Sequence, residues 1–312
     1  MSTTYDTIII GAGAAGLSAG IYAGRYGMKT LILSHELGGE TAQAGVIENW
    51  PGDKEIEGFK LIFRFRDHAL ASGAEIVNSP AVSAMREGEL FHVTDKAGTV
   101  HRGKTVVLAQ GSRRRRLGLP NEEALTGRGV HYCVTCDGPV YGGKTIAMVG
   151  GGDASVKGIL LAAQYASKIL FIVRGNELRA EPVNVEHMRA LGDKVEVLFD
   201  TEVKEIIGTN ALEKLVISKP YHDSTDLVVD GLFVEIGAEP ETDIAKELGV
   251  ILDEYGYVKT DCMMNTNVSG VSAAGDLVNH FGHFKQVITA SATGTAAATA
   301  VFGYLKNARN EK

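Results

Sequence analysis

A strand, a glycine-rich loop and a helix follow one another twice along this chain, and this repeat constrains the fold more than any other feature. The first copy runs from Thr7–Ile10 through the loop Gly11–Gly16 into an alanine-rich helix ending near Tyr26, followed by a strand at 30–33. In such a Gly-x-Gly-x-x-Gly loop the glycines permit a tight turn, close backbone approach to a pyrophosphate, and close helix–strand packing. The first copy therefore predicts a dinucleotide site on Gly11, Gly13, Ala14, Ala15 and Gly16.

The second copy begins at Lys144. It contains a strand at 144–149, the loop Gly150–Ser155, a helix at 156–165 and a strand at 169–173, with Ser155 in the third small position. One such unit can arise by accident, but two, each with its own strand and helix, indicate two dinucleotide sites in one chain. This loop's predicted contacts are Gly150, Gly152, Asp153, Ala154 and Ser155.

Two cysteines three positions apart occur in the segment Cys133-Val134-Thr135-Cys136-Asp137-Gly138. Such a pair closes a small disulfide ring, and when opened it holds one thiolate and one thiol. Asp137 can supply or remove the proton that this change requires. The alternatives are half of a zinc site or two buried structural thiols. A zinc site needs about four ligands, and the remaining cysteine, Cys262, is far along the chain, so we favour redox chemistry and expect no metal.

The residues that would select each nucleotide are unusual in both copies. In the first, Ser34 stands where an acidic residue normally binds ribose hydroxyls, and Glu36 is a possible replacement. In the second, Arg174 stands where a carboxylate would select NAD, and Arg179 follows. Guanidinium groups suit a 2′-phosphate, so we favour NADP over NAD, although both arginines are also consistent with ordinary surface positions.

The C-terminal part contains a short strand that ends in Gly275-Asp276, followed by a predicted helix over 285–305. The Asp276 carboxylate suits ribityl or ribose hydroxyls. The helix N-terminus near Lys285, Gln286 and Val287 would stabilise negative charge on a reduced flavin ring. The alternative is a plain packing helix with small side chains. Cys262, just upstream, is expected to be a buried small hydrophobic residue.

Composition excludes several classes of function. The formal net charge is −7, which disfavours nucleic acid or an anionic membrane surface as partner. No apolar run approaches the length of a membrane span, and the short polar start does not resemble a signal peptide. Three cysteines in 312 residues do not make a secreted disulfide framework, so we expect a cytoplasmic protein.

With these motifs in order, the chain resembles the low-molecular-weight thioredoxin reductases over essentially its whole length. The motifs that carry the resemblance are Gly11-x-Gly13-x-x-Gly16, Gly38-Gly39, Glu48-Asn49-Trp50-Pro51-Gly52, Cys133-x-Thr135-Cys136-Asp137-Gly138, Gly150-x-Gly152, and Gly275-Asp276 with Lys285-Gln286-Val287. The cysteine motif is the most specific.

The resemblance implies an α/β fold of two Rossmann-like domains, the second inserted into the first. It implies an FAD-binding domain at 1–113 and 244–312 and an NAD(P)H-binding domain at 114–243. It also implies a homodimer and a thioredoxin or glutaredoxin-like protein as partner. Asp137 matches the family's acid/base residue and Cys136 the sulfur nearest the flavin. Beyond the loops, the FAD contacts it implies are Glu36, Gly39, Gln43, Asn49, Ala109, Gly111, Gly275, Asp276, Lys285, Gln286 and Val287, and the nicotinamide-nucleotide contacts are Arg174, Arg179 and Gly237.

Four positions near the two predicted nucleotide sites depart from the family pattern. Glu40 replaces a glutamine beside the flavin, and Gln110 interrupts an Ala-Thr-Gly turn. In the fingerprint for the 2′-phosphate, Val173-Arg174-Gly175 replaces His-Arg-Arg while Arg179 is kept. These departures leave NADH or ferredoxin open as donor. They also leave open an oxygen-using dithiol oxidase and a flavin-bound sensor without turnover.

Overall fold

The computed structural model describes residues 3–35, 37–44, 46–282 and 284–310. The chain forms two compact units, which we call unit 1 (Met1–Arg113 and Pro240–Lys312) and unit 2 (Arg114–Glu239). Each unit contains a largely parallel sheet with helices, so the predicted α/β class with one unit inserted into the other is confirmed. The two crossings, β9 (Ser112–Arg114) and β18 (Ala238–Pro240), pair as a two-stranded sheet.

Unit 1 is built on a seven-stranded sheet whose centre is the first predicted strand. The order is β5 (Glu75–Val77), β2 (Thr30–Leu33), β1 (Thr4–Ile10), β8 (Val100–Leu108), β7 (Leu90–Asp95) and β6 (Ala81–Glu87), with β19 (Val271–Ala273) also on β8. The strand β8 is long enough for two neighbours on one edge: 100–103 pairs antiparallel with β7, and 106–108 pairs parallel with β19. Strand β6 was not predicted, because its exposed edge position leaves only a weak apolar pattern.

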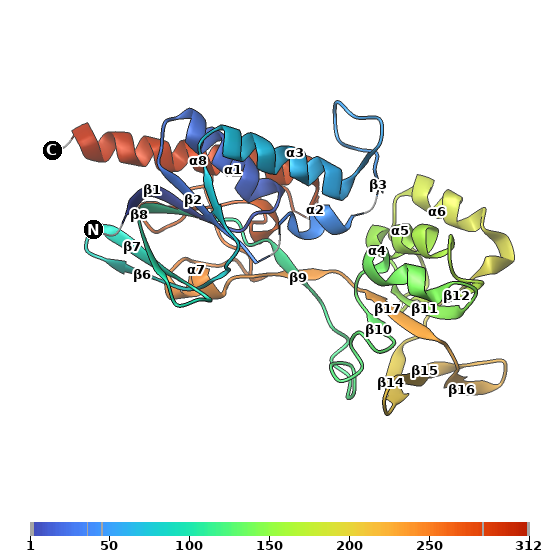
Figure 1. Ribbon diagram of the computed structural model, residues 1–312. Coiled ribbons are helices and arrows are strands. Elements are labelled where there is room, and N and C mark those ends of the chain that lie inside the picture. Colours follow the sequence, from blue (N-terminus) through green and yellow to red (C-terminus); the bar gives the residue numbers. More distant parts are fainter. Residues whose placement is uncertain (1–2, 36, 45, 283, 311–312) are drawn as a thin grey trace. The chain divides into compact units, whose positions relative to one another are not determined.

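Helices α1 (Ala14–Arg25) and α8 (Val287–Asn310) run against each other in unit 1 (Figure 1). A Cβ on Gly294 would lie 2.1 Å from the Ala15 carbonyl oxygen, so this contact requires glycine. Helix α3 (Gly58–Ala71) also packs on α1. The remaining elements of unit 1 are α2 (Gly39–Gln43), α7 (Asp243–Glu247), η3 (Gly275–Leu277) and the hairpin β3 (Val46–Ile47) with β4 (Ile56–Glu57).

Unit 2 has a five-stranded parallel sheet. Its order is β10 (Val130–His131), β17 (Gly231–Glu235), β11 (Thr145–Gly150), β12 (Lys168–Ile172) and β13 (Val195–Leu198). Its helices are α4 (Val134–Asp137), η1 (Gly138–Tyr141), α5 (Asp153–Ala162), α6 (Pro182–Arg189) and η2 (Gly192–Lys194). Helix α5 begins three residues before the predicted start, directly after Gly152.

A three-stranded antiparallel sheet in unit 2 was not predicted. It consists of β14 (Val203–Gly208), β15 (Leu212–Tyr221) and β16 (Ser224–Leu227). Its signal is present in the sequence as Leu212, Leu215 and Ile217, which are all buried and pack with Val130 and Leu232 of the parallel sheet.

Cys262 is exposed, so the prediction of a buried small hydrophobic residue was wrong. It lies in a turn in which the carboxylate of Asp261 accepts hydrogen bonds from the backbone amides of Met263 and Asn265. Met264 fills the buried side of this turn and is 1% exposed, which leaves Cys262 facing outward. Among the described residues, no helix combines the length and the hydropathy needed to cross a membrane.

Candidate active site

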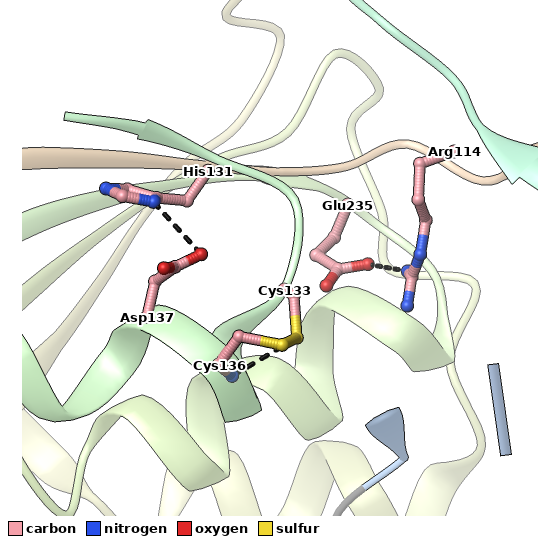
Figure 2. Close-up of a disulfide and its surroundings, with 6 residues drawn as sticks. All are labelled: Arg114, His131, Cys133, Cys136, Asp137 and Glu235. Carbon is pink, nitrogen blue, oxygen red and sulfur yellow. Dashed lines mark hydrogen bonds and ion pairs between the residues drawn. A yellow bond between two sulfur atoms is a disulfide. The ribbon is translucent and has the colours of Figure 1, made fainter. Parts of the chain in front are cut away.

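The two cysteines of unit 2 form a disulfide at the start of a short helix. Cys133 is the residue before α4 and Cys136 lies within it, with their Cα atoms 5.3 Å apart (Figure 2). The backbone amide of Cys136 donates a hydrogen bond to Sγ of Cys133 over 3.1 Å. Cys136 is exposed and Cys133 is half-buried. The sulfurs are therefore accessible, and the amide favours negative charge on Cys133 when the bond opens.

Asp137 follows Cys136 on the same helix, and its carboxylate is engaged by a histidine. Oδ2 of Asp137 lies 3.0 Å from Nδ1 of His131, and Figure 2 shows the carboxylate aimed at this ring. The other ring nitrogen, Nε2, lies 2.6 Å from the hydroxyl of Tyr141. The sequence analysis gave His131 no role. The structure instead places it against the predicted acid/base residue.

A buried glutamate positions the chain that leads to the disulfide. Glu122 is 2% exposed, and its carboxylate accepts hydrogen bonds from the amides of Leu117 and Gly118 and from the hydroxyl of Tyr132. Because Tyr132 directly precedes Cys133, this network ties the cysteine to the segment after the unit boundary. The sequence analysis missed Glu122; its position two residues after Pro120 was an available signal for a carboxylate that caps a turn.

The glycine loop of unit 2 opens onto a cavity of about 260 Å³. The cavity is lined by Gly150, Gly151, Val173, Arg174, Gly175, Asn176, Glu177 and Arg179. Both arginines are exposed, and the backbone amide of Arg179 donates to the carbonyl of Gly151 over 2.7 Å. Helix α5 has no side-chain cap at its N-terminus, so its first amides are available to a phosphate. The loop therefore fits a phosphorylated nucleotide.

Three residues of unit 2 that were predicted to bind the nicotinamide nucleotide are held by hydrogen bonds within the unit. The Asp153 carboxylate accepts from the amide of Glu181 and the side chain of Asn184, so it fixes the start of α6. The hydroxyl of Ser155 donates to the carbonyl of Gly152 over 2.7 Å. The carbonyl of Gly237 accepts from the amide of Arg115.

The glycine loop of unit 1 leaves no room for a side chain at its first and third glycines, Gly11 and Gly16. Gly11 has φ +111°, and a Cβ there would lie 2.2 Å from the carbonyl oxygen of Ala109. A Cβ on Gly16 would lie 1.9 Å from the carbonyl oxygen of Gly11. The hydroxyl of Ser34 accepts from the amide of Ala12, so Ser34 supports the loop itself. Its proposed substitute, Glu36, lies outside the described residues.

Other predicted flavin residues of unit 1 come from distant parts of the sequence. The side chain of Asn49 donates to that of Gln286 over 3.0 Å, which joins the segment after β3 to the start of α8. The amide of Gly275 donates to the hydroxyl of Thr293 on α8. The Nζ atom of Lys285 lies 4.3 Å from the centre of the Tyr257 ring and donates a hydrogen bond to the carbonyl oxygen of Val278.

Burial shifts the pKa values of two charged side chains near Gly275. It raises the pKa of Asp276; the charge of Lys285 opposes this shift and the charge of Glu40 adds to it. Burial also lowers the pKa of Lys285, against the opposing charge of Asp276. The side-chain oxygen of Gln110, next to the glycine loop, is buried and has no hydrogen-bond partner among the described residues. These polar groups, with the uncapped N-terminus of α1, fit a flavin dinucleotide.

The structure distributes the predicted residues over the two units. The residues predicted to bind FAD that the structure describes all belong to unit 1, and they include Gly39, Gln43, Ala109, Gly111 and Val287. The residues predicted to bind the nicotinamide nucleotide belong to unit 2, as does the disulfide. Within unit 2, the disulfide lies on α4, which packs against α5, the helix that follows the glycine loop.

Comparison with known proteins accounts for this arrangement. Residues 5–294 match the family model described as pyridine nucleotide-disulphide oxidoreductase. A thioredoxin reductase from Streptomyces coelicolor is 39% identical over 304 residues, covering 96% of this chain and 93% of that protein.

Solved structures give the same result. The thioredoxin reductase of Lactococcus lactis has a TM-score of 0.90 at 29% identity, covering 97% of this chain and 99% of that one. That of T. acidophilum has a TM-score of 0.88 at 30% identity, covering 96% and 98%. The resemblance predicted from the sequence motifs is confirmed: this chain belongs to the pyridine nucleotide-disulphide oxidoreductase family and is a thioredoxin reductase-like flavoprotein.

Proposed function

We propose that this enzyme passes electrons from NADPH through FAD to the Cys133–Cys136 disulfide, and from there to the disulfide of a thioredoxin. The observation that carries the proposal is an accessible disulfide in a chain with two nucleotide-binding glycine loops. We assign FAD to the domain at 1–113 and 244–312 and the nicotinamide nucleotide to the domain at 114–243. The family resemblance further supports a homodimer and a glutaredoxin-like protein as another acceptor.

The chain's own residues supply the sulfur and proton chemistry. When bound, the flavin supplies a two-electron carrier between the nicotinamide and the disulfide. As an electron pair enters, the sulfur–sulfur bond breaks, Cys136 takes one proton by way of Asp137, and Cys133 stays a thiolate beside the Cys136 amide. This thiolate attacks the partner's disulfide and forms a mixed disulfide. Cys136 then returns its proton to Asp137 and attacks the sulfur of Cys133 as a thiolate, which closes the ring, and the partner leaves with both sulfurs reduced, taking one proton from Asp137 and one from water.

The donor proposal depends on two arginines in the unit 2 cavity. Arg174 and Arg179 both line it and supply the positive charge that a 2′-phosphate requires. Anaerobic addition of one equivalent of NADPH should bleach the flavin absorbance faster than the same amount of NADH. Equal rates would favour NADH as donor, and no bleaching by either would favour ferredoxin or an oxidase.

The test of the function is Cys136→Ser. We expect this variant to bind FAD normally and to lose reduction of thioredoxin, because the ring can no longer form. Cys262→Ser is the matched control, since it removes an exposed thiol outside the pair and should leave turnover unchanged. Retained thioredoxin reduction in Cys136→Ser would refute the assignment.

A further inference from the structure

The His131 ring bridges a carboxylate and a hydroxyl beside the disulfide. Its Nδ1 lies 3.0 Å from Oδ2 of Asp137, and its Nε2 lies 2.6 Å from the hydroxyl of Tyr141. The side chain of His131 is 6% exposed, whereas that of Asp137 is 39% exposed. The mechanism above uses Asp137 alone and gives no role to His131, which Figure 2 shows beside it, or to the buried Tyr141.

Tyr141 can serve either protonation state of the ring. Burial raises its pKa to about 12, with the charges of Asp137 and Asp230 adding to the effect, so its oxygen carries a proton at neutral pH. A phenolic hydroxyl donates to a bare imidazole nitrogen and accepts from a protonated one. His131 therefore gains or loses a proton without leaving Nε2 unpaired, and Nδ1 stays directed at Asp137 in both states.

The elements packed around this contact contribute one aromatic ring and several charged side chains. Phe233 of β17 stacks on the imidazole with ring centres 5.2 Å apart. Lys144 lies 5.4 Å from the centre of the Tyr141 ring, and Asp230 acts on the Tyr141 hydroxyl through its charge. The other charged residues on the packed elements are Asp153 and Lys157 of α5 and Glu235 of β17, the last paired with Arg114.

We propose that His131 is a positioning residue that stores a proton for Asp137, with Tyr141 fixing the ring. A carboxyl group open to water is normally ionised at neutral pH, whereas an imidazole exchanges its proton in that range. Before reduction the pair holds one proton. When two electrons open the disulfide, His131 gives this proton to Asp137, and the exposed carboxylate turns and passes it to Cys136. Cys133 keeps the negative charge, and solvent reprotonates the pair.

The proposal rests on the proposed function, but its test does not require the flavin or a substrate. The full-length protein is reduced with dithiothreitol under argon, and the reductant is removed. Iodoacetamide alkylation of Cys133 and Cys136 is then followed by peptide mass spectrometry from pH 5 to pH 9. Cys262, exposed and on another peptide, reports the reagent's own pH response. A failure of the Cys136→Ser turnover experiment would leave this profile interpretable, and the reverse also holds.

In the native protein we expect the profile of the two thiols to contain a step at which the His131–Asp137 pair loses its proton. In His131→Asn the amide can still donate to Asp137 but cannot store a proton. The step should disappear, and alkylation on the acid side of the native step should fall about 3- to 10-fold, because the variant lacks the stored proton that offsets the carboxylate charge beside the sulfurs. The reductase activity of this variant should lose the same step in its pH profile.

The matched control is His101→Asn. Nε2 of His101 lies 3.0 Å from Oδ2 of Asp95 in unit 1, so the same type of pair is broken far along the chain from the sulfurs. Its profile should superimpose on that of the native protein. A second variant, Tyr141→Phe, retains the ring that packs on Phe233 and should move the step by about half a pH unit or more. A native profile in His131→Asn would overturn the proposal. If His131→Asn does not fold, a native profile in Tyr141→Phe would overturn it instead.

Discussion

The two glycine loops share a sequence pattern but differ in what their backbones tolerate. In unit 1 a Cβ on Gly16 would lie 1.9 Å from the carbonyl oxygen of Gly11. In unit 2 the equivalent position is Ser155, which is fully buried and donates its hydroxyl to Gly152. The space comes from the first glycine, since a Cβ on Gly150 would lie 2.5 Å from the Cβ of Ser155.

This difference shows that the same loop motif can pack against the start of its helix in two ways. Unit 1 brings the helix directly onto the loop backbone, so both ends must be glycine. Unit 2 fills the gap with a serine side chain and needs glycine only at the start. The stricter loop belongs to the unit for which we propose the flavin, and the looser one to the unit that carries the disulfide.

The largest effect should come from Gly16→Ala. The added methyl group would collide with backbone rather than a flexible side chain, at a cost beyond the ~1–3 kcal/mol of ordinary overpacking. We expect protein that is colourless when purified and has a lower melting temperature. Flavin absorbance and thermal unfolding measure this.

The control for that experiment is Gly13→Ala. A Cβ on Gly13 would have a single neighbouring atom, 3.9 Å away, so we expect this variant to fold normally while its affinity for the flavin falls. A Gly16→Ala variant that melts normally and keeps its colour would contradict the claim that this position must be glycine.

Arg174→Ala should have an intermediate effect confined to unit 2. Removing one guanidinium from the cavity should raise the KM for NADPH about 10-fold or more and leave that for NADH nearly unchanged. Steady-state kinetics with both nucleotides measure the ratio, with flavin content as the check on unit 1. An equal loss for both nucleotides would mean that the arginine does not read the 2′-phosphate.

The smallest effect should come from Ser155→Gly, which converts the second loop to the pattern of the first. It removes a buried hydrogen bond and adds glycine to a helix, so unfolding should become easier by about 1–2 kcal/mol. Urea unfolding followed by circular dichroism measures this. Greater stability in the variant would show that the serine does not fill a gap.

Sequence patterns predicted the parts of the molecule that depend on local spacing. Both loops, their strands and the cysteine pair were found because glycine spacing and β-branched runs are local signals. The contacts of His131 with Asp137 and Tyr141 were not, since they require β10, α4 and η1 to fold together. The burial of Cys262 was predicted wrongly, because which residue of a turn faces inward is not a local signal; here it is Met264.

The most direct test of the account is the number of electrons that the protein accepts. Anaerobic titration with dithionite should consume about four electrons per bound flavin in the native protein, two for the flavin and two for Cys133–Cys136. Cys136→Ser should accept about two. Equal uptake by the native protein and the variant would contradict the claim that this disulfide is the second electron acceptor of the chain.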